Sequence, residues 1–191
     1  MVTQAGIPTG EPEWVAEVLH FWFGELRPAD WFAKSDALDA SIRQRFAPLH
    51  ARLAAGEARQ LEPSPRILLA AVIVLDQFSR NLHRDDARAF AFDPLARELA
   101  RRALAQGAER SLSPAERLFL YLPFEHSEDR ADQALALRLV QALGDAGWTR
   151  YAQAHKDIID RFGRFPHRNA MLGRESTAEE LALLDTPMGR F

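Results

Sequence analysis

The chain has 191 residues, a length usual for one compact domain, and 47% of them are hydrophobic, which is enough for a substantial core. Its formal net charge of −3 argues against a general nucleic-acid-binding protein, because such proteins carry a basic excess. The absence of cysteine excludes disulfide bonds, thiolate metal sites and a cysteine nucleophile, and it fits a cytoplasmic protein.

The N-terminal region and the most apolar segment both predict a soluble protein. Residues 1–11 have the composition of a loose leader and lack the charged start and apolar run of a signal peptide. The segment ILLAAVIVL, residues 67–75, is too short to span a bilayer. We therefore expect no membrane partner and interpret residues 67–75 as part of a buried helix.

Residues that start and stop helices punctuate the chain and agree with the spacing of its apolar residues. They predict helices over about 12–24, 36–55, 64–82, 93–106, 113–122, 130–143, 148–162 and 176–184. Glycine is the expected end of five of them, at Gly24, Gly56, Gly107, Gly144 and Gly163.

Three of the predicted helices begin with a capping side chain followed by proline, the residue that fits the first helical position. These starts are Ser64-Pro65, Asp93-Pro94 and Ser113-Pro114. Ser113 and Glu116 also have the spacing of a capping box. Pro123 is expected to interrupt or kink the helix that Ser113 starts, because proline has no N–H to donate.

No segment alternates with the period of a strand, so the predicted fold class is all-α. We expect a single domain of about seven to nine helices, with antiparallel neighbours joined by short loops. A small solenoid of stacked helix pairs is compatible with this pattern, although no internal repeat is visible in the sequence.

Three polar blocks interrupt the apolar background, at residues 75–81, 124–132 and 161–169. In the first block, Asp76 follows nine apolar residues and therefore needs a partner if it is to stay ionised. Arg80, four residues on, can reach it along one helical face. Two readings stay open: a structural ion pair, or an Asp76 that orients Arg80 toward a ligand.

The second block is acidic and the third is basic, so we expect them to pack together. In this interpretation Glu128, Asp129 and Arg161 are members of structural ion pairs. We expect Arg161 and Arg164 to pair with the acidic block and also with Asp157 and Asp160. Ion pairing of this kind would account for most of the charge without any ligand.

Histidine, asparagine and aromatic residues in the same blocks indicate a small-molecule pocket. Glu125, His126 and His167 are the candidate acids and bases. Arginine recognises carboxylates and phosphates in a forked geometry, and asparagine adds a directed amide. The candidate ligand-binding residues are Arg80, Asn81, Arg164, Arg168 and Asn169. No motif for a nucleotide, a metal or a nucleophilic serine is present, so we predict no cofactor and no metal.

Six long motifs carry a resemblance to a known family: VLHFWFGE, WFAKSDALDASIRQRF, LDQFSRN, AFDPLARELARRAL, FLYLPFEHSED and DIIDRFGRFPHRNAMLGRESTAEEL. They are similar to the bacterial family catalogued as domain of unknown function 924, from about Val18 to the C-terminus. The resemblance implies a fold like the α-α superhelices of tetratricopeptide-repeat (TPR) proteins, and it implies no activity. Ser79 stands where the family usually has proline, and glycine is usual near Asp85, so a slightly different turn is expected there.

Three functions follow from these observations. The first is an enzyme or binding protein for a small anionic metabolite. The second is a TPR-like interaction module that clamps a peptide or its C-terminal carboxylate. The third is a purely structural role for the polar blocks. Whether the protein is an enzyme, and its oligomeric state, stay open at this point.

Overall fold

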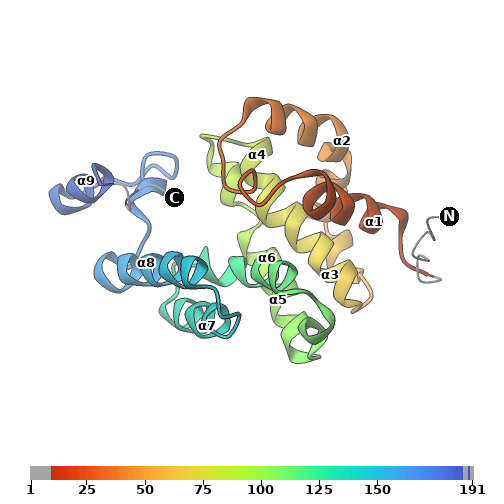
Figure 1. Cartoon of the computed structure of the whole chain (residues 1–191). Helices are drawn as coiled ribbons and strands as arrows, with labels where there is room; N and C mark the ends of the chain where they lie inside the picture. The colour runs from red at the N-terminus through yellow and green to blue at the C-terminus, as the bar shows by residue number, and fades with distance from the viewer. Residues whose placement is uncertain (1–9, 187–188, 190–191) are drawn as a thin grey trace.

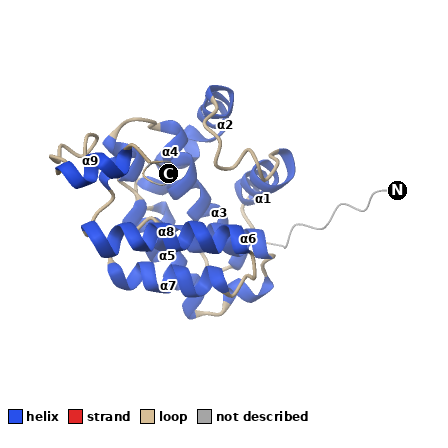
Figure 2. Ribbon diagram, turned by 60° about the vertical axis from the view of Figure 1, so that its left-hand side comes forward, coloured by secondary structure: helices blue, strands red, loops and turns tan. Residues whose placement is uncertain are grey.

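The computed structural model describes residues 10–186 and Gly189, and within them it contains helices and no strand (Figures 1 and 2). All but the last two residues of the expected leader, 1–11, lie outside the described residues. The α-helices are α1 (Glu13–His20), α2 (Asp36–Ala54), α3 (Pro65–Val72), α4 (Ser79–Leu82), α5 (Asp93–Ala105), α6 (Pro114–Glu125), α7 (Arg130–Gln141), α8 (Ala146–Phe162) and α9 (Ala178–Leu184).

Two π-helical segments and four short 3₁₀ helices complete the secondary structure. The π-helices are η1 (Phe21–Glu25), which continues α1, and η3 (Ile73–Phe78), which joins α3 to α4. The 3₁₀ helices are η2 (Glu57–Gln60), η4 (Ala87–Phe90), η5 (Ala108–Ser111) and η6 (Pro166–Arg168). The all-α prediction is therefore confirmed for the described part of the chain.

Capping side chains start several helices where the sequence predicts them. Ser113 accepts a hydrogen bond from the backbone N–H of Glu116, and the carboxylate of Glu116 accepts one from the backbone N–H of Ser113, so the expected capping box is present. Thr177 and Glu180 form a second capping box at α9. Gly163 ends α8 in the left-handed conformation, with φ of 69°, which glycine adopts without strain.

Three local predictions are wrong. Gly24 lies inside η1 and does not end the first helix. Asp93 does not cap α5, because its carboxylate accepts hydrogen bonds from Arg80 and Phe92 occupies the cap position. Pro123 does not interrupt α6, which runs on to Glu125; its missing N–H removes one backbone hydrogen bond, which the packing of the buried end of the helix outweighs.

The helices pack in succession around one large core. Helix α5 packs on α3 and α6, α6 on α7, and α7 on α8, so the later helices form a layered stack in the lower half of Figure 1. Aromatic rings fill the centre of the molecule: Phe78 contacts Phe46 and Trp22, with ring centroids 4.9 and 5.6 Å apart. This succession is that of a single all-α domain; the TPR-like superhelix stays a prediction.

The C-terminal segment has a small apolar cluster of its own. Ile158 and Ile159 of α8 pack with the fully buried Phe165, and Phe162 and Leu183 cover them. Helix α9 stands beside this cluster at the left of Figure 1. The segment therefore rests on the end of α8 and does not enter the main core.

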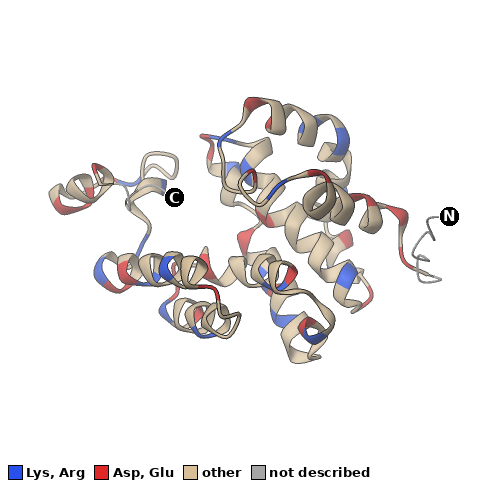
Figure 3. Cartoon of the chain, in the orientation of Figure 1, with Lys and Arg blue, Asp and Glu red and all other residues tan. Residues whose placement is uncertain are grey.

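Charged residues of both signs are interspersed along the helices (Figure 3). Many of them form pairs across neighbouring elements, such as Arg45 with Glu25 at 2.8 Å and Arg84 with Asp39 at 2.6 Å. In the part of the chain that the structure describes, no helix is long and apolar enough to cross a membrane.

Candidate functional site

Asp76 lies at the centre of a polar cluster because the helix that carries it changes to π-geometry there. The six residues of η3 interrupt the α-helical ladder between α3 and α4, and such insertions are frequent at functional sites. The side chain of Asp76 is fully buried. Its carboxylate accepts a hydrogen bond from Gln77 and lies 3.2 Å from Nη1 of Arg80. The expected ion pair of Asp76 with Arg80 is therefore present.

His126 completes this arrangement from the C-terminal end of α6. Its Nδ1 lies 2.8 Å from Oδ1 of Asp76. Although burial favours the protonated acid, Arg80 and His126 hold the pKa of Asp76 well below its ordinary value. An ionised carboxylate only accepts hydrogen bonds, so Nδ1 of His126 carries the proton that it donates.

The imidazole of His126 is neutral at pH 7. Burial and the nearby Arg80 guanidinium lower its pKa from the ordinary 6.5. With the proton on Nδ1, the lone pair is on Nε2, and a carboxylate that fixes this tautomer is the arrangement of a general base. The geometry thus gives His126 the means to accept a proton from a bound molecule.

Two arginines from distant parts of the chain share one carboxylate beside this pair. Arg80 donates to both oxygens of Asp93, at 3.0 and 3.1 Å. Arg168 of η6 donates to the same carboxylate at a longer 3.4 Å and to the backbone oxygen of His126 at 3.0 Å. Burial, and then repulsion from Arg80, lower the pKa of Arg168 to about 10. The charge of Arg168 is only partly compensated.

Aromatic rings hold the Arg168 guanidinium on two sides. Its central carbon lies 4.5 Å from the ring centroid of Phe90 and 4.7 Å from that of Phe165. Its Nε is buried and has no hydrogen-bond partner in the described part of the chain. The Nε–H edge of the guanidinium is therefore left for a further partner.

A second pair, Glu125 with His155 of α8, lies next to the first. Nδ1 of His155 is 3.1 Å from Oε1 of Glu125 and donates to the backbone oxygen of Tyr151 at 2.9 Å. Burial, with the negative charge of Asp76, raises the pKa of Glu125 to about 8. Burial lowers the pKa of His155 to about 3. The site therefore contains an ionised acid, Asp76, and a protonated one, Glu125.

His155 was missed as a site residue in the sequence. It occupies the buried face of α8 with Ala152 and Ile159, and the only signal was a histidine within that apolar stripe. A histidine at such a position satisfies the sequence pattern of a core residue equally well. Its proximity to Glu125 depends on how α8 packs against α6, which sequence spacing does not reveal.

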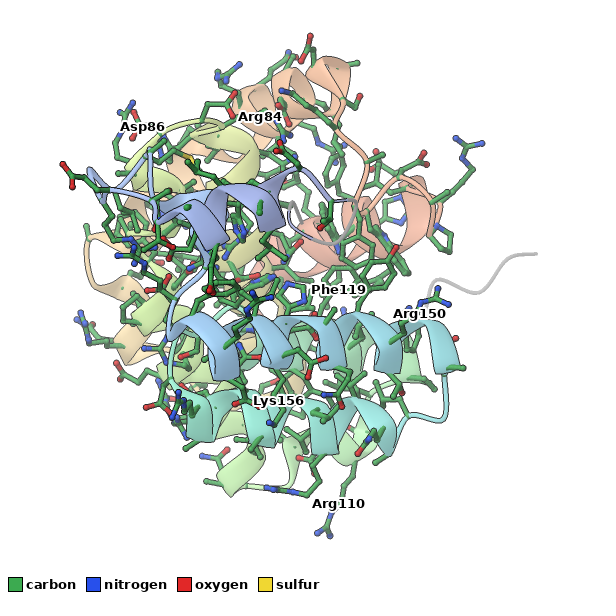
Figure 4. The ribbon with its side chains drawn as sticks, turned by 90° about the vertical axis from the view of Figure 1, so that its left-hand side faces the viewer. Arg84, Asp86, Arg110, Phe119, Arg150 and Lys156 are labelled. Atoms are coloured by element: carbon green, nitrogen blue, oxygen red, sulfur yellow. The ribbon has the colours of Figure 1, made fainter. Side chains whose placement is uncertain are left out.

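Asn81 is not part of the cluster. Its amide donates to Oδ1 of Asp39 at 2.8 Å, in a network that Arg84 completes. Arg84 lies in the upper part of the molecule in Figure 4. The repeated Arg-Asn pairs of the sequence therefore do not act together: Arg80 and Asn81 face different partners, as successive helical residues must.

The basic block pairs mainly with α9, which corrects the expected pairing. Arg164 donates to both oxygens of Glu180, at 2.6 and 2.8 Å, and Arg161 lies 3.3 Å from Glu179. The sequence interpretation assigned both arginines to the acidic block. It failed because Glu179 and Glu180, in the short last helix, are brought back toward the end of α8 by the turn after it.

The acidic block also differs from the prediction in part. Asp129 forms no ion pair with another described residue but caps α7, accepting from the backbone N–H groups of Ala131 and Asp132 at 2.8 and 3.0 Å. Glu128 does form an ion pair, with Arg174 at 2.8 Å. Residues 126–129 of the block form the loop between α6 and α7, and the rest of the block belongs to the ends of those helices.

The remaining candidates, His167 and Asn169, lie in and after η6. The ring of His167 packs on Phe165 with centroids 5.5 Å apart, and burial, with the charge of Arg168, lowers its pKa to about 3. The amide of Asn169 donates to the hydroxyl of Ser176 at 3.0 Å. The catalytic and ligand-binding roles expected for these residues stay predictions.

Two surface hollows lie away from the polar cluster. One, of about 330 Å³, is lined by residues between Phe21 and Ser41. The other, of about 240 Å³, lies between Trp14 and Arg52. Among the described residues, no three His, Asp or Glu side chains converge as a metal site would require. The cluster is thus a dense network at the edge of solvent.

Comparisons with known proteins agree with this fold. The model of the family described as "Bacterial protein of unknown function (DUF924)" matches residues 18–188. A solved structure of the protein of unknown function ATU0120 from Agrobacterium tumefaciens is 40% identical, covers 90% of this chain and 96% of that chain, and superimposes with a TM-score of 0.85. No curated protein matches the chain. The chain belongs to the DUF924 family of bacterial proteins of unknown function.

Proposed function

We propose that the protein binds a small anionic ligand at the cluster of Asp76, Arg80, Asp93, His126 and Arg168, and that His126 acts on it as a general base. The ligand class is a small molecule with one carboxylate or phosphate group. The proposal combines two properties of the cluster: a cation, Arg168, that is incompletely compensated, and a histidine whose tautomer is held by a buried carboxylate.

The observation that carries the proposal is the sharing of Asp93 by two guanidinium groups. Arg80 takes both oxygens of this carboxylate, so Arg168 retains only a long contact of 3.4 Å to it. A buried cation of this kind is stabilised strongly by an anion that reaches it, because charge-assisted hydrogen bonds are strong where water is scarce. An anion at Arg168 would also relieve its repulsion by Arg80.

The exposure of the cluster limits the size of the group that it admits. The side chains of Arg80, His126 and Arg168 are 23%, 15% and 8% exposed. So little exposed surface favours a single anionic head group over an extended peptide as the ligand. The protonated Glu125 would then serve as a nearby acid, with a pKa close to the working range of such groups.

The geometry gives less support to a peptide clamp. Arg164 and Asn169, two of the residues expected to line such a groove, are occupied within the C-terminal segment by Glu180 and Ser176. The packing of α5 on α6, α6 on α7 and α7 on α8 supports a TPR-like superhelix as part of the proposal. The fold can therefore be TPR-like while its site serves a metabolite.

Thermal-shift screening with small carboxylates and phosphate esters tests the proposal. At ten times its dissociation constant, a ligand should raise the melting temperature of the wild type by about 3 to 6 °C. Arg168→Gln should lose this shift, whereas Arg161→Gln, which removes an exposed arginine from the neighbouring helix, should keep it. Failure of every compound, or equal shifts in both variants, would contradict the proposed site.

A further inference from the structure

We infer that residues 164–186 form a strap that carries Arg168 into the site, and that Glu128 is the positioning residue that holds the strap closed. The inference extends the proposed function, because it explains how a ligand reaches a cluster that is almost covered. It concerns the attachment of the C-terminal segment, which can be measured without any ligand.

The first observation is that the strap is separate from the main core. The buried residues of that core run from Val15 to Ala152 and include none from the strap. Phe165 is anchored instead in the small cluster with Ile158 and Ile159. Helix α9 contributes one fully buried side chain, that of Glu180, and it packs mainly against η6. Segments with so few buried apolar contacts open at lower cost than the rest of a domain.

The second observation is that polar contacts join the strap to the helices before α8. Side chains of the strap that make such contacts include Arg168, which reaches Asp93 and His126, and Arg174, which reaches Glu128. In Figure 4, α9 lies above α8 on the side of the molecule that faces the viewer. The strap is thus fastened at the edge of the site itself.

Glu128 is the central fastening because it binds the strap at two places. Its carboxylate accepts from both Nη atoms of Arg174, at 2.8 and 2.9 Å. It also accepts from the backbone N–H of Phe165 at 2.8 Å. Although burial favours its protonated form, these hydrogen bonds hold the pKa of Glu128 below its ordinary value. One carboxylate therefore sets the position of the turn that contains Arg168.

The consequence is a site assembled from two parts. Asp76, Arg80, Asp93 and His126 belong to the helical body, and Arg168 is supplied by the strap. Gly163, at the boundary, has the left-handed conformation in which a chain changes direction. Release of the Glu128 contacts would swing Arg168 away and expose His126, and an anion bound between Arg80 and Arg168 would close the strap again.

Hydrogen exchange measured by mass spectrometry on the ligand-free protein tests the strap. In Glu128→Gln, we expect the amides of residues 165–186 to exchange at least about tenfold faster than in wild type, because a charge-assisted contact is lost. Amides of α2, α3 and α6 should exchange as before. Glu179→Gln is the matched control, since it removes a surface pair on the same segment and should leave the exchange near the wild-type rate.

Arg174→Gln provides a second measurement, because it releases the same contact from the strap side and leaves Glu128 in place. The inference is overturned if Glu128→Gln and Arg174→Gln exchange like Glu179→Gln, or if exchange rises equally throughout the domain. Inorganic phosphate and succinate serve as probes in a separate arm, where binding should slow exchange in residues 165–186. If neither probe binds the wild type, the proposed function fails. The exchange rates of the ligand-free variants still show whether Glu128 holds the strap in place.

Discussion

The raised pKa of the buried Glu125 predicts a change in the free energy of unfolding with pH. Its pKa is raised from 4.5 to about 8 by burial and by Asp76, so the folded protein keeps a proton that the unfolded chain releases above pH 4.5. A raised pKa of this kind contributes stability that is fully present below the unfolded value and is lost as the pH rises through the folded value. The contribution of Glu125 to the free energy of unfolding should therefore fall between pH 6.5 and 7.5.

The magnitude follows from the linkage of one proton. Each pH unit in this window should lower the contribution of Glu125 to the free energy of unfolding by about 1.4 kcal/mol. The buried histidines act in the opposite sense near pH 6.5, because their lowered pKa values make the folded state release protons that the unfolded state still binds there. The wild type and a variant of Glu125 share this contribution, so the difference between them isolates Glu125.

Glu125→Gln removes the titrating group and keeps the shape of the side chain. Urea unfolding at pH 6.5 and 7.5 should show the stability of the variant rising relative to the wild type by about 1.4 kcal/mol over this interval. Glu62→Gln, at an exposed glutamate, is the matched control. The reasoning is refuted if the difference between Glu125→Gln and the wild type is the same at both pH values.

Three further substitutions test other parts of the structure. His155 has a pKa of about 3, so it makes the folded protein less stable as the pH falls below 6.5. His155→Gln should therefore flatten the pH dependence of the free energy of unfolding between pH 5 and 6 by about 1.4 kcal/mol per pH unit in urea unfolding. Gly163→Ala forces a side chain into a φ of 69° and should lower stability by about 1 to 2 kcal/mol in the same assay. Asp76→Asn breaks a fully buried ion pair and should cost about 3 to 5 kcal/mol; a smaller loss than 1 kcal/mol would argue against a charged Asp76.

Much of the fold could be predicted because its signals are local. Caps such as Ser113 and Thr177 and stops such as Gly163 act through neighbouring residues, so they function as the sequence indicates. The π-helical segments could not be predicted in the same way. An extra residue in one turn leaves an apolar run such as that before Asp76 unchanged, and the cost of the altered hydrogen bonds depends on the packing around it.

The candidate site likewise has one part that local spacing predicts and another part that depends on packing. The pair of Asp76 with Arg80 could be predicted because residues four apart share a helical face. The role of Asp93 could not, because the dipeptide Asp93-Pro94 also has the form of a helix start. Arg168 is separated from Asp93 by 75 residues, and such contacts are determined by the packing of whole helices. The sequence therefore indicated which residue types would form a site but not which of them would meet.

The central claim is that Arg168 is the anion-binding group of the cluster, and the side-chain Nε–H resonance of Arg168 tests it most directly. Isotope-labelled protein is titrated with inorganic phosphate and, separately, with succinate, and Arg168→Gln identifies the resonance. We predict that one of these anions shifts the Arg168 resonance in a saturable manner and leaves that of Arg161 unchanged. Binding of neither anion, or binding that leaves the Arg168 resonance in place, would contradict the account.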